Sequence, residues 1–537
     1  MEDGSALPRT SDTGLVDFPA AGSGSHRQAR SGQRQVPAWL PLVAVLAVQT
    51  LLTVRLLRAD TAFQDEALYL WAGHREIAHL LHGTPIPPFA SYFSGAPVLY
   101  PVLGAMADSV GGLAGARILS LIFMLGATAL LWSVARRLYG PVAAFFAAAL
   151  FAVLGPTLHL GAFATFDAMA LFLVALATWC VVRAGDRRDA TAWMVTAGIV
   201  LAVANATAYA STIYDVVVIL LALTLAYPAP GGKQAVSRCF TLLTVLVVLI
   251  GLGILIGGSY YESGIAQTTI ARVPGAASPL TVLGDAWLWT GLAILLALAA
   301  VAFSLITREG WARTLPLAVF AAAAMVGPLE QAHLHTAASL NKHVGHGVWF
   351  AAIAAGYAVD RLVMAAPAGR SRAVTCGACV VALVFPATLG ISQSKTFSSD
   401  WPNASAFIAI LRPYVGHGHG RVLVEDPSIA EYYLGTAGAD WKRWSSTRNI
   451  VLPSGKNTGG PSTSAGVTGP GNKGVFEEFI LQRYFSVIAL NFQDTSTLDK
   501  QLNRELKHDK KHYRIVQVVP YGPWPGTYII FQRRRPG

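Results

Sequence analysis

Long apolar blocks follow one another along most of the chain, and short polar segments separate them. The blocks hold about 18 to 22 residues, the length that an α-helix needs to cross a hydrocarbon core roughly 30 Å thick. We place spans near residues 37–57, 117–135, 141–158, 166–183, 192–208, 211–227, 240–258, 284–306, 315–330, 345–364 and 374–394. The pattern therefore predicts a polytopic α-helical membrane protein with about eleven transmembrane helices.

Basic residues lie at alternate ends of these spans, which predicts the orientation of the chain. Arg27, Arg30 and Arg34 precede the first span and place the N-terminus in the cytoplasm. The loops that then fall inside contain Arg136, Arg137, Arg183, Arg187, Arg188, Lys233, Arg238, Arg308, Arg313, Arg361, Arg370 and Arg372. After about eleven spans the C-terminal segment lies outside the cytoplasm, and the protein is expected in the cell membrane.

Three parts of the chain differ from the spans: residues 1–36, 58–116 and 395–537. Residues 1–36 are rich in Gly, Ser and Arg and are expected to form a disordered cytoplasmic tail. Residues 58–116 form a long outer loop of the transmembrane domain 37–394, and within it residues 66–81 have the pattern of an amphipathic helix at the membrane surface.

Residues 395–537 are polar and mixed, which predicts a soluble extracytoplasmic α/β domain. Its strand-like runs are 421–424, 485–490, 513–519 and 527–531, and its helical patterns are 404–411, 475–483 and 497–507. Residues 454–474 are rich in Gly, Ser and Thr and are expected to be a mobile loop.

Composition agrees with this picture and excludes several classes. Hydrophobic residues make up 53% of the chain and charged residues 13%, too apolar for one soluble domain. The net charge of +11 follows the membrane topology, so no nucleic-acid partner is expected. The cysteines lie in or beside spans, and the C-x-x-C of Cys376 and Cys379 is interpreted as packing residues rather than a redox pair.

Carboxylates at the outer ends of two spans are the first candidates for chemistry. Asp65 and Glu66 begin the amphipathic helix, and Tyr69, a candidate substrate contact, follows them. Acidic residues stabilise a helix N-terminus, so capping is one interpretation. A functional role is the other, because carboxylates near an apolar boundary are costly and a general base needs such a group. Asp167, at the outer mouth of another span, has the same two interpretations.

The short outer segment near residues 330–346 contains groups that bind metals or anions. Glu330, His333, His343 and His346 are candidate substrate or metal contacts. Their spacing matches no standard metal motif, so interfacial polar residues are the favoured interpretation, and a divalent cation remains the open alternative.

Two cations near the outer face suit a phosphate group at the depth of the lipid headgroups. These are Arg117 and Lys342. Binding of ordinary anionic lipid, or snorkelling of the side chain to the interface, is the alternative for both.

Several short motifs together resemble a known family. They are Asp65-Glu66, residues 94–100 (SGAPVLY), residues 115–120 (GARILS) and residues 166–170 (FDAMA). Their order resembles the C-type integral-membrane glycosyltransferases that use polyprenyl-phosphate sugars, such as the protein O-mannosyltransferases and lipid A aminoarabinose transferases. The resemblance covers roughly residues 60–230. Many relatives carry His-Pro-Pro or Lys-Pro-Pro where this chain has Gly95-Ala96-Pro97, so a substrate contact is altered there.

The resemblance implies an inverting transfer of a sugar from a lipid phosphate carrier to an acceptor hydroxyl at the outer face of the membrane. Asp65 would be the general base, and Glu66 and Asp167 further catalytic residues. Arg117 and Lys342 would contact the donor phosphate, with a divalent cation left open. The donor would be a polyprenyl-phosphate sugar, and the acceptor a glycan, a lipid or a protein of the cell envelope, in a bacterium by composition.

Two other functions are weighed against this one. A polytopic transporter or lipid flippase also has many spans, but it usually carries charges near the bilayer midplane or internally repeated halves. A scaffold that only anchors the C-terminal domain would need one or two spans. The outer position of the carboxylates favours the transferase.

Overall fold

The computed structural model describes residues 37, 39–186, 189–226, 232–272, 274–415, 420–435, 441–447, 479–493, 495–521 and 526–534. The chain divides into two compact units, Met1–Leu40 and Pro41–Gly537, and the fold below is that of the second. The predicted N-terminal tail, the loop 454–474, and Arg187 and Arg188 lie outside the described residues.

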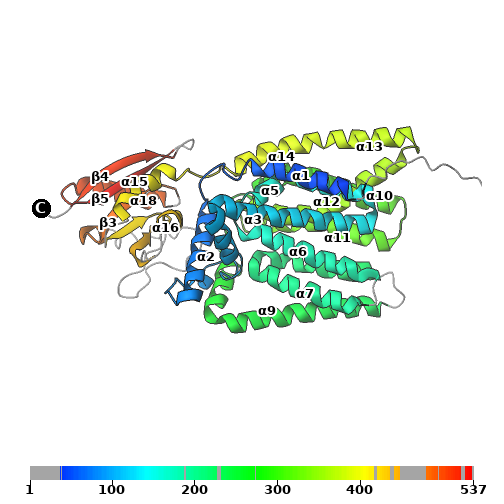
Figure 1. Cartoon of the computed structure of the whole chain (residues 1–537), viewed down its shortest axis with the longest axis horizontal. Coiled ribbons are helices and arrows are strands. Elements are labelled where there is room, and N and C mark those ends of the chain that lie inside the picture. Colours follow the sequence, from blue (N-terminus) through cyan, green and yellow to red (C-terminus); the bar gives the residue numbers. More distant parts are fainter. Residues whose placement is uncertain are drawn as a thin grey trace, which may run out of the picture. The chain divides into compact units, whose positions relative to one another are not determined.

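Apolar helices make up most of the second unit (Figure 1). They are α1 (Leu40–Val54), α3 (Tyr100–Tyr139), α4 (Pro141–Val153), α5 (Gly155–Gly161), α6 (Phe166–Arg183), α7 (Ala190–Thr207), α8 (Asp215–Ala226), α9 (Lys233–Thr268), α10 (Pro279–Ile306), α11 (Trp311–His333), α12 (Leu340–Ala365), α13 (Arg370–Ala382) and α14 (Val384–Phe397). Short 3₁₀ helices are η1 (Phe89–Ser91), η2 (Ala184–Asp186), η3 (Tyr209–Tyr214) and η4 (Trp441–Arg443).

The fold class is confirmed, and the number of spans needs one refinement. Within the described residues, 9 helices are long and apolar enough to cross a membrane, or 10 if α4 and α5, bent by 69°, form one span. The first predicted span corresponds to α1, which has only 15 residues and falls below that length. The protein is a multi-pass membrane protein.

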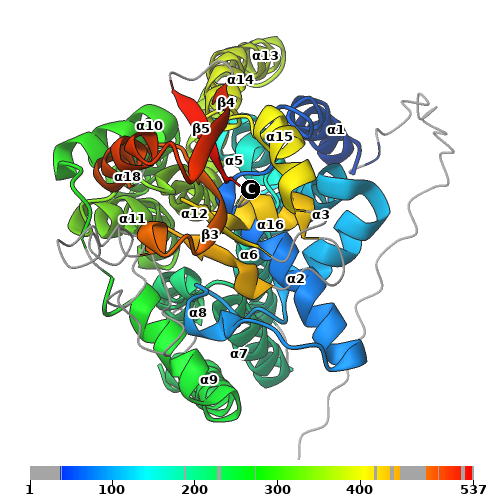
Figure 2. The same ribbon diagram turned by 90° about the vertical axis from the view of Figure 1, so that its left-hand side faces the viewer.

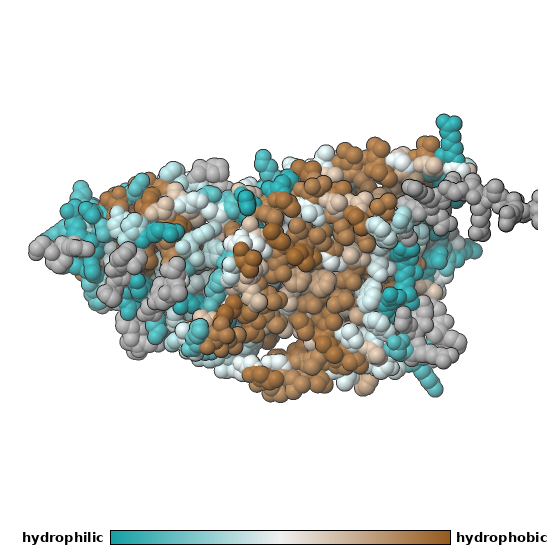
Figure 3. All heavy atoms as spheres, in the orientation of Figure 1, coloured by the Kyte–Doolittle hydropathy of each residue, from teal (hydrophilic) through white to brown (hydrophobic). Residues whose placement is uncertain are grey.

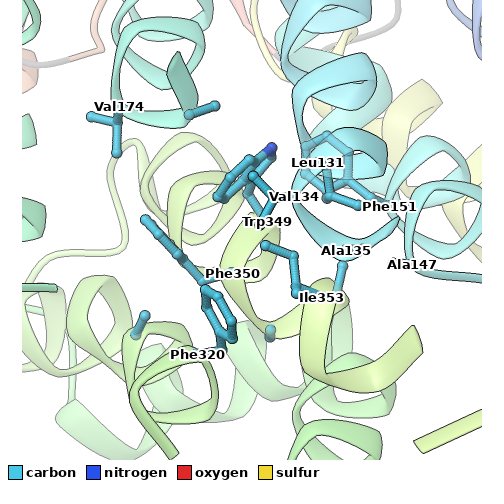
Figure 4. Packing of buried hydrophobic residues seen from close by; sticks show 14 of the residues in the cluster. Leu131, Val134, Ala135, Ala147, Phe151, Val174, Phe320, Trp349, Phe350 and Ile353 are labelled. Atoms are coloured by element: carbon cyan, nitrogen blue, oxygen red, sulfur yellow. The ribbon is translucent and has the colours of Figure 1, made fainter. Parts of the chain in front are cut away.

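The centre of the bundle is apolar and built around α12, which packs against α4, α10 and α11. Figure 4 shows its side chains among residues of the neighbouring helices. The fully or almost fully buried residues there include Leu131, Val134, Ala147, Phe151, Phe320, Trp349, Phe350 and Ile353. The Trp349 indole N–H donates to the Ala127 carbonyl at 2.9 Å, because a buried polar group must find a partner.

Small residues allow these helices to approach closely. A Cβ placed on Gly356 of α12 would lie 2.3 Å from the carbonyl oxygen of Ala143 in α4, so only glycine fits there. Outward-facing side chains remain large and apolar, as at Leu255 and Ile256 of α9. Figure 3 shows this apolar surface over the helices, with hydrophilic residues toward their ends.

Residues 58–116, the predicted first outer loop, are mostly helical. They contain α2 (Gln64–His82), which confirms the amphipathic helix expected over 66–81 and runs across the ends of the membrane helices (Figure 1). The first part of α3 also lies in this loop, up to a break at Gly112, where φ is 60° and ψ is −160°. Such a conformation favours glycine because it has no Cβ.

The C-terminal residues form the expected α/β domain around a five-stranded mixed sheet. Its helices are α15 (Ser405–Val415), α16 (Pro427–Leu434) and α18 (Ser496–His508), and its strands are β1 (Arg421–Val424), β2 (Trp444–Ser446), β3 (Phe485–Leu490), β4 (Tyr513–Pro520) and β5 (Thr527–Arg533). The strand order is β2-β1-β3-β5-β4, with β1 parallel to β2 and β3, and β5 antiparallel to β3 and β4.

Two apolar clusters cover this sheet, one with α15 and one with α18. Strand β2 was not expected from the sequence, since three residues are too few for a period-two pattern. The helix expected over 475–483 lies partly outside the described residues. On the side of the membrane helices, α16 packs against α2 (Figures 1 and 2), so this domain covers the first outer loop.

Candidate active site

Three helices begin close together at the end of the bundle next to the C-terminal domain, and each carries a charged residue in its first turn. Asp65 lies in α2, Asp167 in α6 and Lys342 in α12. The N-terminal turn of a helix has a positive partial charge, which favours the two carboxylates and disfavours the lysine. The carboxylates offset that cost for Lys342.

The lysine ammonium joins the two carboxylates. Lys342 Nζ donates to Asp65 Oδ2 at 2.7 Å and lies 3.8 Å from Asp167 Oδ2. Thr165 Oγ1 donates to the same Asp167 oxygen at 2.6 Å. The three side chains differ in access: that of Asp65 is 28% exposed, against 10% for Asp167 and 8% for Lys342. Asp65 is therefore the carboxylate that a bound molecule reaches.

Aromatic rings surround these charges. Lys342 Nζ lies 5.5 Å from the centre of the Phe163 ring, a cation–π contact. Tyr69 is buried, with ring centres 4.7 Å from Phe166 and 5.5 Å from Phe93. Burial, followed by the charges of Asp65 and Asp167, raises the pKa of Tyr69 well above its usual value. Tyr69 is thus a neutral phenol in the wall of the site.

A second ion pair lies beside the first and is sealed from solvent. Arg117 forms a bidentate pair with Glu66, Nε to Oε1 at 2.8 Å and Nη2 to Oε2 at 2.7 Å. Glu66 also accepts from the backbone N–H groups of Phe63 and Ala164. The remaining N–H groups of Arg117 donate to the carbonyl oxygens of Leu57, Asp60 and Thr61 at 3.0, 3.1 and 3.4 Å.

This pairing changes what can be expected of Arg117. Each of its five N–H groups has an acceptor within the protein, so the side chain holds the outer loop in place. Glu66 likewise has both oxygens engaged. Of the two predicted phosphate contacts, only Lys342 stands beside an accessible group.

Of the predicted metal or substrate contacts of the 330–346 segment, His343 and His346 lie close enough to Asp167 to interact with its charge, and the others face elsewhere. His333 is exposed at the end of α11, whereas His346 is buried and stacks on Tyr214 with ring centres 5.5 Å apart. Glu330 accepts from Gln331 Nε2 at 2.6 Å, and the carbonyl of His343 accepts from Tyr214. Among the described residues, no three His, Cys, Asp or Glu side chains form a group that fits a metal ion.

The altered motif at Gly95-Ala96-Pro97 has a structural explanation. The Ala96 N–H donates to the Ala206 carbonyl at 2.7 Å, and the Tyr209 N–H donates to the Ser94 carbonyl at 2.8 Å. A Cβ on Gly95 would lie 2.1 Å from the carbonyl oxygen of Thr207. This loop therefore packs backbone against backbone and has no room for a side chain at position 95.

Sequence reasoning missed the residues that hold the loop before Asp65 from the C-terminal side. Trp401, Asn403 and Tyr433 all bond to residues 60–62. They lie more than 330 residues away in the chain, and no local pattern marks them.

The chain is similar in sequence to one family model and in structure to several solved proteins. Residues 103–256 match the family described as dolichyl-phosphate-mannose-protein mannosyltransferase. ArnT from Cupriavidus metallidurans, bound to undecaprenyl phosphate, matches with a TM-score of 0.58 at 15% identity, over 91% of this chain and 97% of that one. The fold is the C-type glycosyltransferase fold. The resemblance drawn from the short motifs is thereby confirmed.

A second relative of this C-type fold is archaeal. The oligosaccharyltransferase AglB from Archaeoglobus fulgidus, in complex with an inhibitory peptide and a dolichol-phosphate, has a TM-score of 0.54 at 15% identity, over 84% of this chain and 69% of that one. Another structure of that enzyme is a complex with zinc and sulfate. No curated protein matches the sequence significantly. At such identities the solved structures establish the fold alone.

Proposed function

We propose that the protein is an inverting glycosyltransferase that moves a sugar from a polyprenyl-phosphate carrier to an acceptor hydroxyl at the outer face of the membrane. One observation carries the proposal: an accessible carboxylate, Asp65, lies 2.7 Å from a buried cation, Lys342, at the outer ends of the helices. The family match and the fold support it, since ArnT was solved with undecaprenyl phosphate.

In this proposal each group has a separate task. The acceptor oxygen attacks the anomeric carbon as the bond from that carbon to the phosphate oxygen breaks, and its proton passes to Asp65. The electron pair of the broken bond leaves with the polyprenyl phosphate. Lys342, a buried cation, would stabilise the charge on that phosphate. Asp167 balances the lysine while Asp65 takes up the proton.

The orientation of the chain follows from the same proposal. The positive-inside pattern puts the N-terminus in the cytoplasm and the C-terminal domain outside. The site then opens toward the outer leaflet, where a polyprenyl-phosphate sugar presents its headgroup. Acceptors of the cell envelope, whether glycan, lipid or protein, approach from the side that the C-terminal domain covers.

The test is sugar transfer from a panel of radiolabelled polyprenyl-phosphate sugars by purified protein supplied with an envelope extract. We expect turnover of one donor, lowered by about 10² to 10⁴ in Asp65→Asn while donor binding is kept. Asp189→Asn is the matched control, because Asp189 is an exposed carboxylate at the start of α7 with no side-chain capping bond.

Two outcomes would contradict the proposal. If the wild-type protein neither binds nor turns over any donor, the glycosyltransferase hypothesis is wrong. Transport of lipid or sugar is then assayed next. If Asp65→Asn turns over the donor like the wild type, the reaction stands and the base has to be another group.

A further inference from the structure

The loop that precedes Asp65 is held from two sides. On the side of the bundle, Arg117 donates to the carbonyl oxygens of Leu57, Asp60 and Thr61. On the other side, the chain that leaves the last membrane helix crosses the same loop. This second set of contacts comes from residues that lead into the C-terminal domain.

Three hydrogen bonds join that segment to the loop. Trp401 Nε1 donates to the Thr61 carbonyl at 2.9 Å, and Asn403 Nδ2 donates to Asp60 Oδ1 at 2.7 Å. The Ala404 N–H donates to Thr61 Oγ1 at 3.0 Å. The Thr61 carbonyl thus accepts from the bundle and from the segment at once. Trp401 is only 6% exposed, so its bond is protected from water.

The C-terminal domain reaches the loop at a second place through α16. The hydroxyl of Tyr433 accepts from the Ala62 N–H at 2.8 Å. Its neighbour Tyr432 donates to Asp108 Oδ1 of α3 at 2.6 Å, and Asp108 Oδ2 is 2.7 Å from His74 Nε2 of α2. The domain is therefore fastened to both helices of the first outer loop.

Aromatic contacts connect the segment to the Asp65–Lys342 pair. The Trp401 ring lies 5.2 Å from the ring of Phe63 and 5.9 Å from that of Phe163. Phe63 precedes the first residue of α2, and Phe163 is the ring beneath the Lys342 ammonium. The contact with Phe63 therefore ties Trp401 to the first turn of α2, which carries Asp65.

We propose that Trp401, Asn403 and Tyr433 are positioning residues for the transfer: they fix residues 60–62 and thereby the place of the Asp65 carboxylate. The inference rests on the proposed function. Misplacing a catalytic group by about 1 Å can cost 10²-fold in rate, whereas none of these residues contacts Lys342. Loosening the segment therefore lowers kcat and leaves the KM for the donor unchanged.

The experiment uses the full-length enzyme and an exchange of partners. Trp401→Phe keeps a smaller aromatic ring and removes the N–H, and Asn403→Asp sets a second carboxylate against Asp60. Adding Asp60→Asn to Asn403→Asp restores an amide–carboxylate bond in the opposite sense. Trp287→Phe is the control, because Trp287 is 51% exposed on the outside of α10. Each variant is assayed for kcat, donor KM and amide hydrogen exchange in peptides covering residues 57–66.

We expect Trp401→Phe and Asn403→Asp to lower kcat by about tenfold or more, with donor KM within twofold and faster exchange at 60–66. The double variant Asp60→Asn/Asn403→Asp recovers most of the kcat lost in Asn403→Asp, and Trp287→Phe behaves like the wild type. The proposal is overturned if amide hydrogen exchange at 60–66 or kcat is unchanged in the single variants. It is also overturned if Asn403→Asp lowers kcat and adding Asp60→Asn does not restore it. If the wild type uses no donor, the proposed function has failed, and hydrogen exchange alone decides whether the segment holds the loop.

Discussion

Asp65 and Glu66 are neighbours in the sequence, yet they occupy opposite environments. Successive residues of a helix point about 100° apart. That rotation turns Glu66 inward, where its side chain is fully buried against Arg117, and leaves Asp65 at the accessible side beside Lys342. The sequence marked both carboxylates and both cations, but not which carboxylate would pair with which cation. Pairing across 277 residues, as between Asp65 and Lys342, is set by the tertiary structure, in which α2 packs against α3 and α3 against α12.

Lys342 offers the sharpest prediction for a single residue. Lys342→Gln leaves two carboxylates close together without their shared cation, and one of them then binds a proton more tightly. We expect donor turnover to fall by 10²-fold or more and the phosphate carrier to bind more weakly, because the site loses its positive charge. Lys342→Arg keeps the positive charge on a larger, planar group and should retain part of the affinity for the phosphate carrier. Titration of each variant with polyprenyl phosphate, which lacks the sugar, measures the affinity for the carrier. The prediction is contradicted if Lys342→Gln binds the carrier as tightly as the wild type.

At the scale of elements, hydropathy predicted the membrane helices well because lipid demands a long apolar helix at every crossing. Each predicted span falls on a helix, and α2 was found from its amphipathic pattern. The breaks were not predicted, although each stands at a local signal: Gly155-Pro156 lies at the bend between α4 and α5, and Gly111-Gly112 at the break in α3. The loop at residues 94–97 is a similar case, where the motif was visible and its backbone packing was not.

Gly95 tests that packing. In Gly95→Ala the new Cβ meets the Thr207 carbonyl at 2.1 Å, so the two backbone bonds to residues 206 and 209 must shift. We expect overpacking to cost about 1–3 kcal/mol of stability, and transfer activity to fall with it. Gly111→Ala is the matched control, because a Cβ there meets nothing within 4 Å. Thermal unfolding in detergent compares the two, and equal unfolding temperatures would show that the loop yields easily.

At the scale of the whole molecule, the C-terminal domain is tied to the site rather than merely appended to it. The sequence predicted an α/β domain outside the membrane, but its contacts with α2 come from side chains that no periodicity singles out. One of these contacts involves a titratable group. Glu431 of α16 is buried and lies close enough to Arg75 of α2 to interact with its charge. Burial, with the charge of Asp426 adding and that of Arg75 opposing, raises the pKa of the Glu431 carboxyl to about 8.

The sign of the resulting pH effect follows from proton binding. Between its usual pKa near 4.5 and about 8, Glu431 holds a proton in the folded state and loses it in the unfolded state. The folded state binds more protons, so this carboxyl makes stability fall as the pH rises, by at most about 1.4 kcal/mol per pH unit. Glu431→Gln mimics the protonated form and removes that dependence. We expect the variant to unfold at the wild-type temperature at pH 5 and at a higher temperature at pH 8.5, with slower proteolytic release of the domain. A variant that is less stable than the wild type at pH 8.5 would mean that the carboxylate is charged and paired at this interface.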